Sequence, residues 1–462
     1  MIVLIVIVIV LETAGDLYNL IIYKHPHLIV RSVGDDFYFV KNPYISNGER
    51  LLNLSQYNVF SLFNGKNSIV DVATLLNLQF SQVLKFYKLI KSQSFVNDQD
   101  KFPVPKWNYS ENTGLNLWIH VTNNCNLSCP YCYIHSIHSN NVFPVQNYNQ
   151  LGNKILQTVI NRKLKTVKIR LSGGEPLLFF NTWKSFVKSL FEKFEKINCK
   201  LHVSVLTNLT ILNDDIISFA KQYNIGFGVS VDGYEGYHDK TRKFISGEGS
   251  FEIVSKNLLV LTNNRINVSV STVVSDYNME GLPELTKHLI KLNLPFRYSI
   301  VHAVDINRNK LSEILHQCYN LFEDAIVSYN YKFKEKFKLC DLKTSEIYFQ
   351  TCAFGRFGGA IYCDGGIHSC HVNFEVEEKL GNIFNDEDLI SIFEKKRHIN
   401  DVQSEECLRC DFRYICTSGC PVYRESGKDL SCDIYKEFIP RHFELIGKEK
   451  LLQIKKNGIV HP

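Results

Sequence analysis

Residues 115–301 alternate between strand-like and helix-like segments, and this alternation constrains the fold more than any other feature of the 462-residue chain. Amphipathic helical patterns such as 183–196, 214–222, 251–261 and 282–292 separate six apolar runs of strand length. The six runs lie at 115–121, 166–171, 201–206, 225–231, 266–273 and 296–301. Strands that each precede a helix form a parallel sheet with right-handed crossovers, so the sequence predicts an α/β fold built on a partial (β/α)6 TIM-like barrel. In such a barrel, the chemistry is expected at the carboxyl ends of the strands.

Other units flank the predicted barrel. Residues 28–100 contain two strand-like runs around Gly34-Asp35-Asp36, then three short helical patterns, which is a winged-helix-like order. Residues 311–327 form a helix on whose apolar face Cys318 is expected to pack in the core. The predicted domains are a winged-helix-like unit at 1–105, the barrel at 106–310, a bridging helical region at 311–345 and a cysteine-rich domain at 346–462.

The first eleven residues are almost wholly apolar. This run is shorter than the roughly 20 residues of a membrane-spanning helix, and it lacks the basic start and clear cleavage site of a signal peptide. Its Ile and Val content favours a buried strand. A net charge of +5 is thinly spread over the chain, so neither nucleic acid nor a membrane is indicated as a partner. We therefore expect a cytoplasmic protein.

Fourteen cysteines are an unusual number for such a chain. Tight cysteine clusters in a chain without a convincing export signal bind metal more often than they form disulfides. The first cluster, Cys125, Cys129 and Cys132, has the spacing C-x3-C-x2-C and directly follows the first predicted strand. Three thiolates can bind three irons of a 4Fe–4S cluster and leave the fourth iron open. The alternative is a zinc loop that borrows a ligand such as His135 or His138.

Polar motifs also follow the next three strands. The paired glycines of the segment after the second strand would let the backbone approach a ligand closely, and the carboxylate beside them could accept hydrogen bonds from an amine. The guanidinium that follows the fourth strand suits a carboxylate. The residues concerned are Gly173, Gly174 and Glu175, then Thr207 and Asn208, then Ser230 and, further on, Arg242. Ordinary turns and a surface ion pair are the structural alternatives.

These motifs, in this order along residues 115–310, resemble the radical S-adenosylmethionine (SAM) superfamily. The resemblance implies that the open iron chelates the amine and carboxylate of SAM, whose cleavage releases a 5′-deoxyadenosyl radical that removes a substrate hydrogen. It also implies that Tyr131 lies against the adenine and that Gly174 with its neighbours Gly173 and Glu175 meets the amine. Ser230 and Arg242 would bind the carboxylate or ribose, and Thr207 and Asn208 complete the predicted cofactor-binding set.

The C-terminal cysteines are too numerous for one metal site, and two zinc sites are one alternative. Their spacing over residues 346–440 resembles the SPASM domain, which carries two auxiliary 4Fe–4S clusters. The family pattern implies a first auxiliary cluster on Cys352, Cys370 and Cys420, and a second on Cys407, Cys410, Cys416 and Cys432. Cys340 is the best candidate for the missing fourth ligand; otherwise one iron stays open to the substrate. Cys363 and Cys199 are interpreted as structural. Such clusters offer a route for the electron that oxidative chemistry releases, and an external flavodoxin- or ferredoxin-type donor is implied.

The N-terminal unit resembles the peptide-recognition element of maturases of ribosomally made peptides. Such a unit binds a leader peptide by adding it as a strand to an open sheet edge. A packing module or a DNA-binding winged helix is the alternative. DNA binding is disfavoured because residues 51–63 contain no Lys or Arg to contact phosphates.

The sequence therefore predicts a radical SAM peptide maturase that installs a cross-link on a leader-guided precursor. An alternative resemblance is to the anaerobic sulfatase-maturating enzymes, which form formylglycine. Those enzymes carry an Asp base where this chain has His371, although an imidazole with a pKa near 6.5 could also accept a proton. An iron–sulfur electron carrier or a zinc scaffold is the non-enzyme alternative; neither would need Gly174, Ser230 and Arg242 gathered around an open cluster.

Overall fold

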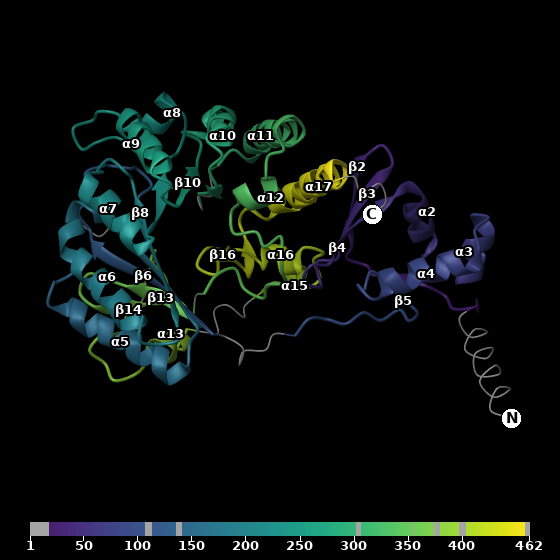
Figure 1. Cartoon of the computed structure of the whole chain (residues 1–462), viewed down its shortest axis with the longest axis horizontal. Helices are drawn as coiled ribbons and strands as arrows, with labels where there is room; N and C mark the ends of the chain where they lie inside the picture. The colour runs from purple at the N-terminus through teal and green to yellow at the C-terminus, as the bar shows by residue number, and fades with distance from the viewer. Residues whose placement is uncertain are drawn as a thin grey trace.

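The computed structural model describes residues 18–106, 113–134, 141–301, 306–353, 355–372, 374, 379–396 and 403–457. The strand predicted at residues 1–11 lies outside this part of the chain. Figure 1 shows the barrel at one end of the molecule and the N-terminal module at the other, with the C-terminal helices between them. None of the described helices combines the length and the apolar character needed to cross a bilayer.

The barrel is built on a ten-stranded sheet, and its six central strands are the six that the sequence predicts. All neighbours from β12 to β13 pair in parallel, and only β14 and β15 are antiparallel. The strands in spatial order are β12 (Phe337–Leu339), β11 (Phe296–Ile300), β10 (Val268–Val274), β9 (Gly226–Ser230), β8 (Lys200–Thr207), β7 (Thr166–Gly173), β6 (Gly114–Thr122), β13 (Gly358–Ile361), β14 (Gly366–His368) and β15 (Gly381–Asn382). The cysteine-rich region thus contributes strands to the barrel's own sheet, beyond the six-stranded prediction.

Helices cover the outer face of this sheet. They are α5 (Asn147–Arg162), α6 (Phe180–Phe194), α7 (Asp214–Tyr223), α9 (Phe251–Asn263) and α10 (Leu282–Lys291), with short helical turns at η3 (Pro176–Phe179), α8 (Gly236–Asp239) and η4 (Met279–Gly281). Alternation within each strand separates the two faces of the sheet. In β7, Val167, Ile169 and Leu171 are buried, whereas Lys168 and Arg170 on the inner face remain accessible. The barrel interior is therefore polar and open to solvent.

The N-terminal module is a three-stranded antiparallel sheet followed by three helices. Its elements are β2 (Ile29–Gly34), β3 (Phe37–Lys41), β4 (Glu49–Asn53), α2 (Leu54–Leu62), α3 (Ile69–Leu75) and α4 (Phe80–Lys91), with the small pair β1 (Tyr23–Lys24) and β5 (Val96–Asn97) beside them. The two predicted strands and three predicted helices are present, and β4 was not predicted. Asn53 with Gln56, and Ser68 with Asp71, form capping boxes that start α2 and α3.

The C-terminal region ends in a long helix that packs against the N-terminal module. The region contains α11 (Arg308–Tyr329), α12 (Phe333–Lys336), α13 (Leu389–Glu394), α15 (Glu405–Leu408), α16 (Arg413–Cys416), β16 (Arg424–Glu425), β17 (Lys428–Asp429) and α17 (Cys432–Lys456). Cys318 on α11 is fully buried, as predicted. Phe39 and Val33 share one core with Phe443 on α17. Gly447 permits this contact, because a Cβ there would lie 2.6 Å from the Cβ of Phe39.

Candidate iron–sulfur and substrate site

The cysteine loop follows β6 at the carboxyl end of the barrel and gathers Cys125, Cys129 and Cys132. Burial raises the pKa of Cys125 to about 12, with smaller contributions from nearby Glu175 and the other two thiols. Nitrogen donors point at two of the three sulfurs. The backbone N–H of Leu127 lies 3.5 Å from the Cys125 sulfur, and an Arg242 guanidinium nitrogen lies 3.9 Å from that of Cys129. Such donors stabilise thiolates and tune a bound cluster.

The donor set, three thiols in one short loop, suits an iron–sulfur cluster, whose irons are held by cysteine thiolates. In the part of the chain that the structure describes, no group of three or more His, Cys, Asp or Glu side chains is placed to hold a single metal ion. His135 and His138, the alternative zinc ligands, lie outside the described residues.

The paired glycines lie against the cysteine loop. The N–H of Gly174 donates to the Thr122 carbonyl at 2.7 Å, and the N–H of Glu175 donates to the Asn124 carbonyl at 2.8 Å. Gly173 has a φ of 129°, and a Cβ at Gly174 would overlap the Asn124 carbonyl oxygen. These glycines thus let the backbone of their own loop come close to the cysteine loop, and they hold that loop in place.

Glu175 is a buried hub that joins the ends of β7 and β8. Its carboxylate accepts hydrogen bonds from the Thr207 hydroxyl at 2.7 Å, the Asn208 N–H at 2.7 Å and the Leu177 N–H at 2.9 Å. Burial raises its pKa to about 7 against the opposing effect of these donors. The Asn208 side chain in turn lies 3.7 Å from the Cys125 sulfur. Three residues predicted to bind the cofactor therefore also bind one another.

Asp232 is a second buried hub, and its role was missed in the sequence. One of its oxygens accepts hydrogen bonds from the Tyr131 hydroxyl, from the Thr241 hydroxyl at 3.0 Å and from Nε of Arg242 at 2.9 Å. The other oxygen accepts one from the Val273 N–H at 3.1 Å. Burial alone would lower the pKa of Arg242, but Asp232 holds it above its ordinary value. Asp232 and Gly233 directly follow the strand that Ser230 ends, but nothing in this dipeptide points to Tyr131.

Ser230, the remaining predicted SAM contact, ends β9 on the inner face. It is half-buried and pairs in register with Ser271 of β10. It therefore faces the barrel interior, on the same face as the accessible residues of β7.

The thiols of the C-terminal region influence one another's pKa values. Burial raises the pKa of Cys370 to about 12, and the thiols of Cys352 and Cys420 add to this rise. Burial also raises the pKa of Cys416, as do Cys432 and Cys407. Burial raises the pKa of Cys410 too, and the Cys407 thiol adds to that rise. The division of these thiols into two cluster-binding sets stays a prediction.

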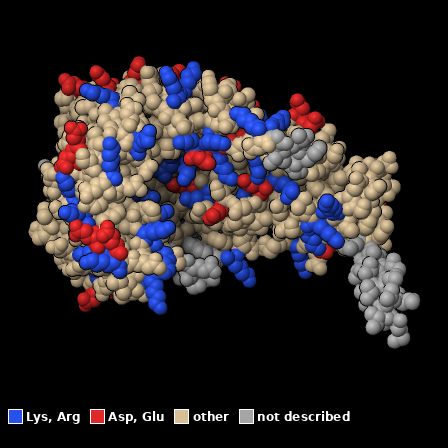
Figure 2. Space-filling view, viewed as in Figure 1, with Lys and Arg blue, Asp and Glu red and all other residues tan. Residues whose placement is uncertain are grey.

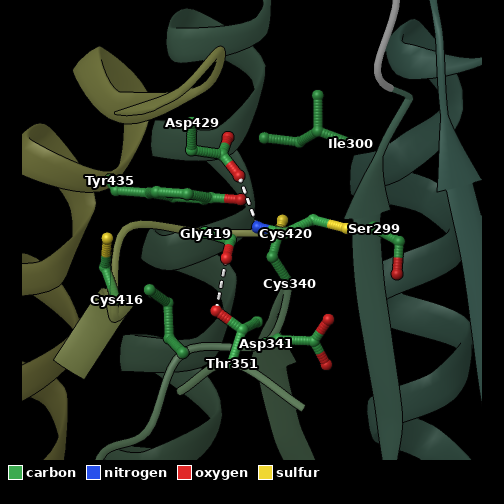
Figure 3. Close-up of a pocket in the computed structure, with 11 residues that line it drawn as sticks. Ser299, Ile300, Cys340, Asp341, Thr351, Cys416, Gly419, Cys420, Asp429 and Tyr435 are labelled. Carbon is green, nitrogen blue, oxygen red and sulfur yellow. Dashed lines mark hydrogen bonds between the residues drawn. The ribbon is translucent and has the colours of Figure 1, made fainter. Parts of the chain in front are cut away.

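Cys340 lies at the same small cavity as Cys420, together with Cys416, Asp429 and Tyr435 (Figure 3). It is buried, and burial raises its pKa to about 11. Its backbone N–H donates to the Tyr298 carbonyl at 2.6 Å, which anchors it beside β11. Because Cys416 of the other predicted set lines the same cavity, the role of Cys340 as fourth ligand stays a prediction. Cys363, in contrast, points at the His120 carbonyl oxygen, 3.4 Å from its sulfur, and is fully buried, as a structural cysteine would be.

His371 stacks on Trp118 of β6, with ring centroids 3.8 Å apart and the rings 3° from parallel. The ring of Tyr133 meets its edge at 5.6 Å. Burial lowers the pKa of His371 to about 3, and the charges of Arg297 and Arg170 lower it further. The imidazole is therefore neutral and weakly basic, which does not favour the general-base role considered from the sequence.

Comparison with known proteins agrees with this geometry. Residues 119–289 match the family model described as the radical SAM superfamily. This segment is thus similar to the radical SAM superfamily. Its cysteine loop, the Gly173–Glu175 loop and Asp232 all lie within the matched residues. The family implies SAM and a 4Fe–4S cluster, and the cysteine-rich C-terminus fits auxiliary clusters.

Two curated relatives extend beyond the radical SAM segment. A cysteine-type anaerobic sulfatase-maturating enzyme of Clostridium novyi (strain NT) is 24% identical over 360 residues, which cover 70% of this chain and 93% of the relative. The radical SAM cyclopropyl synthase TigE of Paramaledivibacter caminithermalis is 21% identical over 479 residues, which cover 95% of this chain and 90% of TigE. The solved structure of native anSMEcpe with bound AdoMet and Cp18Cys peptide superimposes with a TM-score of 0.60 at 20% identity, covering 73% of this chain and 99% of that one. This last likeness establishes the fold.

Proposed function

We propose that the chain is a radical SAM peptide maturase that installs a cross-link, such as a thioether, carbon–carbon or ether bond, on a precursor peptide held by its leader. The cluster at Cys125, Cys129 and Cys132, when bound, supplies the electron that cleaves SAM. The remaining work falls to the chain itself. The Gly173–Glu175 loop positions the cysteine loop, and Asp232 fixes the orientations of Tyr131 and Arg242. An external flavodoxin- or ferredoxin-type donor would deliver the electron.

The N-terminal module is the observation that carries this proposal. Its sheet has the order β2-β3-β4, so β2 and β4 each pair on one side only among the described strands. An unpaired strand edge offers backbone donors and acceptors to an extended peptide. The match to TigE covers 95% of this chain, whereas the sulfatase-maturating relative covers 70%. A module beyond the catalytic regions favours leader-guided maturation over sulfatase maturation.

Sulfatase maturation is the second candidate, because the cysteine-type maturating enzymes are among the most similar relatives. It calls for a base beside Cys370, and here that position holds the stacked, weakly basic His371. A sulfatase-derived peptide with a central Cys tests this candidate directly. Its conversion to formylglycine by the reconstituted enzyme would overturn the leading proposal.

The first experiment measures 5′-deoxyadenosine after anaerobic reconstitution with iron and sulfide and addition of SAM and dithionite. Wild-type protein is expected to form it, and Cys129→Ala is expected to abolish it while retaining the iron of the C-terminal sites. Absence of 5′-deoxyadenosine in the iron-loaded wild type would contradict a radical SAM function.

The second experiment tests leader binding. Because the module shares a core with α17, deleting it would expose Phe443 and confound the result. Hydrogen exchange avoids this problem. Peptides encoded by any short open reading frames neighbouring the gene are synthesised and added to the full chain, and amide exchange is followed in β2, β3 and β4. Slower exchange in β2 or β4 is expected, because an added strand would pair with its free backbone groups. Unchanged exchange at saturating peptide would contradict the leader role.

A further inference from the structure

The turn between Cys416 and Cys420 has an unusual backbone conformation. Three residues in a row have a positive φ, which is 53° at Thr417, 63° at Ser418 and 75° at Gly419. A side chain makes this left-handed region unfavourable, and a β-branched residue such as Thr417 is an outlier there. Strain of this kind persists only where the surrounding structure fixes the backbone. We call Thr417–Gly419 the left-handed turn, and its conformation needs a cause outside the turn itself.

The side chain of Arg424 supplies that cause. Its guanidinium donates hydrogen bonds to the carbonyl oxygens of Thr417 at 2.8 Å, Ser418 at 2.9 Å and Gly419 at 3.0 Å. Thr417 and Ser418 are buried, and buried carbonyl groups need hydrogen-bond partners. The N–H groups of a guanidinium lie in a fixed plane, whereas Lys carries a compact ammonium without this arrangement. One side chain therefore binds all three carbonyl groups of the strained segment.

Two further side chains contact the turn from other segments, and Figure 3 shows them on opposite sides of it. On one side, the Thr351 hydroxyl donates to the Gly419 carbonyl. On the other side, the Asp429 carboxylate accepts the N–H of Cys420 at 3.1 Å and the N–H of Ser431 at 2.8 Å. A Cβ at Gly419 would lie 1.8 Å from an Asp429 carboxylate oxygen, so only glycine permits this approach.

A short hairpin carries two of these contacts. Arg424 of β16 lies directly opposite Asp429 of β17. Arg424 binds the carbonyl oxygens of the left-handed turn, and Asp429 accepts the N–H of Cys420, the residue that follows the turn. The hairpin therefore holds both the acceptors and a donor of the strained backbone.

The segments that meet at the left-handed turn all carry cysteines predicted to bind iron. Thr351 comes directly before the first of them, the turn joins the next two, and Ser431 comes directly before the last. In order along the chain, these cysteines are Cys352, Cys416, Cys420 and Cys432. A change in the turn would therefore move several of these thiols relative to one another.

We propose that Arg424 is a positioning residue for the auxiliary iron–sulfur sites. Its guanidinium holds the left-handed turn in a conformation that its residues disfavour, and this conformation sets where the surrounding thiols lie. Without the guanidinium, three buried carbonyl groups lose a donor, and the backbone relaxes out of the left-handed region. The inference rests on the auxiliary clusters of the proposed function, and it assigns to them a residue that binds no iron itself.

The iron of the C-terminal sites, measured in a Cys129→Ala background, tests this role. Anaerobically reconstituted and desalted Cys129→Ala protein is expected to hold about eight iron atoms per chain, about four for each auxiliary cluster. Adding Arg424→Gln should lower this content to about four or fewer. The electron paramagnetic resonance spectrum of the dithionite-reduced protein should lose the signal of at least one cluster in parallel. An iron content that stays near that of Cys129→Ala would overturn the proposal.

Ser418→Gly tests whether Arg424 acts against backbone strain. Glycine adopts a positive φ without steric cost, and the Ser418 hydroxyl has no hydrogen-bond partner in the part of the chain that the structure describes. The substitution therefore removes strain and no hydrogen bond. Added to Arg424→Gln, it should restore at least half of the lost iron. A glycine elsewhere would destabilise the fold, so this recovery is specific to the turn. No recovery would overturn the proposal.

Arg409→Gln is the matched control for the loss of a positive charge. Arg409 directly precedes Cys410, but its side chain is 84% exposed and pairs with Glu405 at 3.2 Å. Lys and Arg side chains are spread over the face of the molecule that Figure 2 shows, so the loss of one more surface charge is a small change. The control should keep its iron. An iron loss as large as that of Arg424→Gln would overturn the proposal.

Arg424→Lys keeps the charge and replaces Arg424→Gln if far-UV circular dichroism shows that the latter is unfolded. It should hold less iron than the Cys129→Ala parent and more than the Gln variant, because an ammonium lacks the planar arrangement of donors. An iron content equal to that of the parent would overturn the role of the guanidinium.

The readouts separate this inference from the proposed function. If the wild type forms 5′-deoxyadenosine but Arg424→Gln keeps all of its iron, the positioning role fails and the radical function stands. If Arg424→Gln loses iron that Ser418→Gly restores, but the iron-loaded wild type forms no 5′-deoxyadenosine, the positioning role stands and the maturase proposal fails.

Discussion

Gly174→Ala is the sharpest test of how the barrel positions the cysteine loop. A Cβ at this position would lie 2.1 Å from the Asn124 carbonyl oxygen, whereas real Cβ atoms essentially never approach another heavy atom within 3.0 Å. The end of β7 and the cysteine loop would therefore have to move apart by about 0.9 Å. Both partners are backbone, so no flexible side chain can absorb the overlap.

The movement would break the two hydrogen bonds that join the loops, from Gly174 to Thr122 and from Glu175 to Asn124. Each is worth about 1 kcal/mol, and a displacement of about 1 Å at a reacting centre can cost about 100-fold in rate. We expect 5′-deoxyadenosine formation to fall by about 100-fold. The C-terminal sites are remote from this contact and should keep their iron.

The assay compares iron per chain and the rate of 5′-deoxyadenosine formation in wild type, Gly174→Ala and a control, Gly236→Ala. A Cβ at Gly236 would meet nothing within 4 Å, although this residue lies on the segment between Asp232 and Arg242. The control should therefore retain the wild-type rate. A Gly174→Ala enzyme with more than half of the wild-type rate would show that the loop contact does not position the cluster.

Three further predictions concern sites away from this loop. Cys416→Ala should lose up to one cluster's share of iron, about four atoms per chain, whereas Cys199→Ala should lose none, as measured by colorimetric iron assay. Ser68→Ala removes one half of the capping box of α3 and should cost that helix about 1 kcal/mol, seen as faster local hydrogen exchange. Burial lowers the pKa of His442 to about 3, below its value of about 6.5 in the unfolded chain. The unfolded state therefore binds the proton first as the pH falls, and the free energy of unfolding drops by about 2 kcal/mol between pH 6.5 and pH 5. Urea unfolding of His442→Phe should show that much less acid sensitivity than the wild type, and equal slopes would refute the assignment.

The barrel strands were predictable because each combines an apolar run with a following amphipathic helix. The strands at its flanks were not. β13 is Gly-Gly-Ala-Ile and β12 has three residues, so neither carries a period-2 pattern long enough to read. Pairing with β6 and β11 makes them strands. β4 was missed for another reason: its Leu51 and Leu52 run directly into the leucine that begins α2, so the segment resembles the start of a helix.

The cysteine motifs were visible in the sequence, because chelation by one short loop leaves its mark within a few residues, and which thiols hold each cluster stays a prediction. The hub at Asp232 leaves no such mark. It joins Tyr131 and Arg242, which lie 101 and 10 residues away along the chain. Only the folded barrel brings the end of β9 against the cysteine loop.

Glu175 and Asp232 join the ends of barrel strands. Both are fully buried and each accepts hydrogen bonds from at least three donors, although burial still raises the pKa of Glu175 to about 7. Burying a charge without such partners is costly, which is why these two carboxylates act as fixed joints between strands.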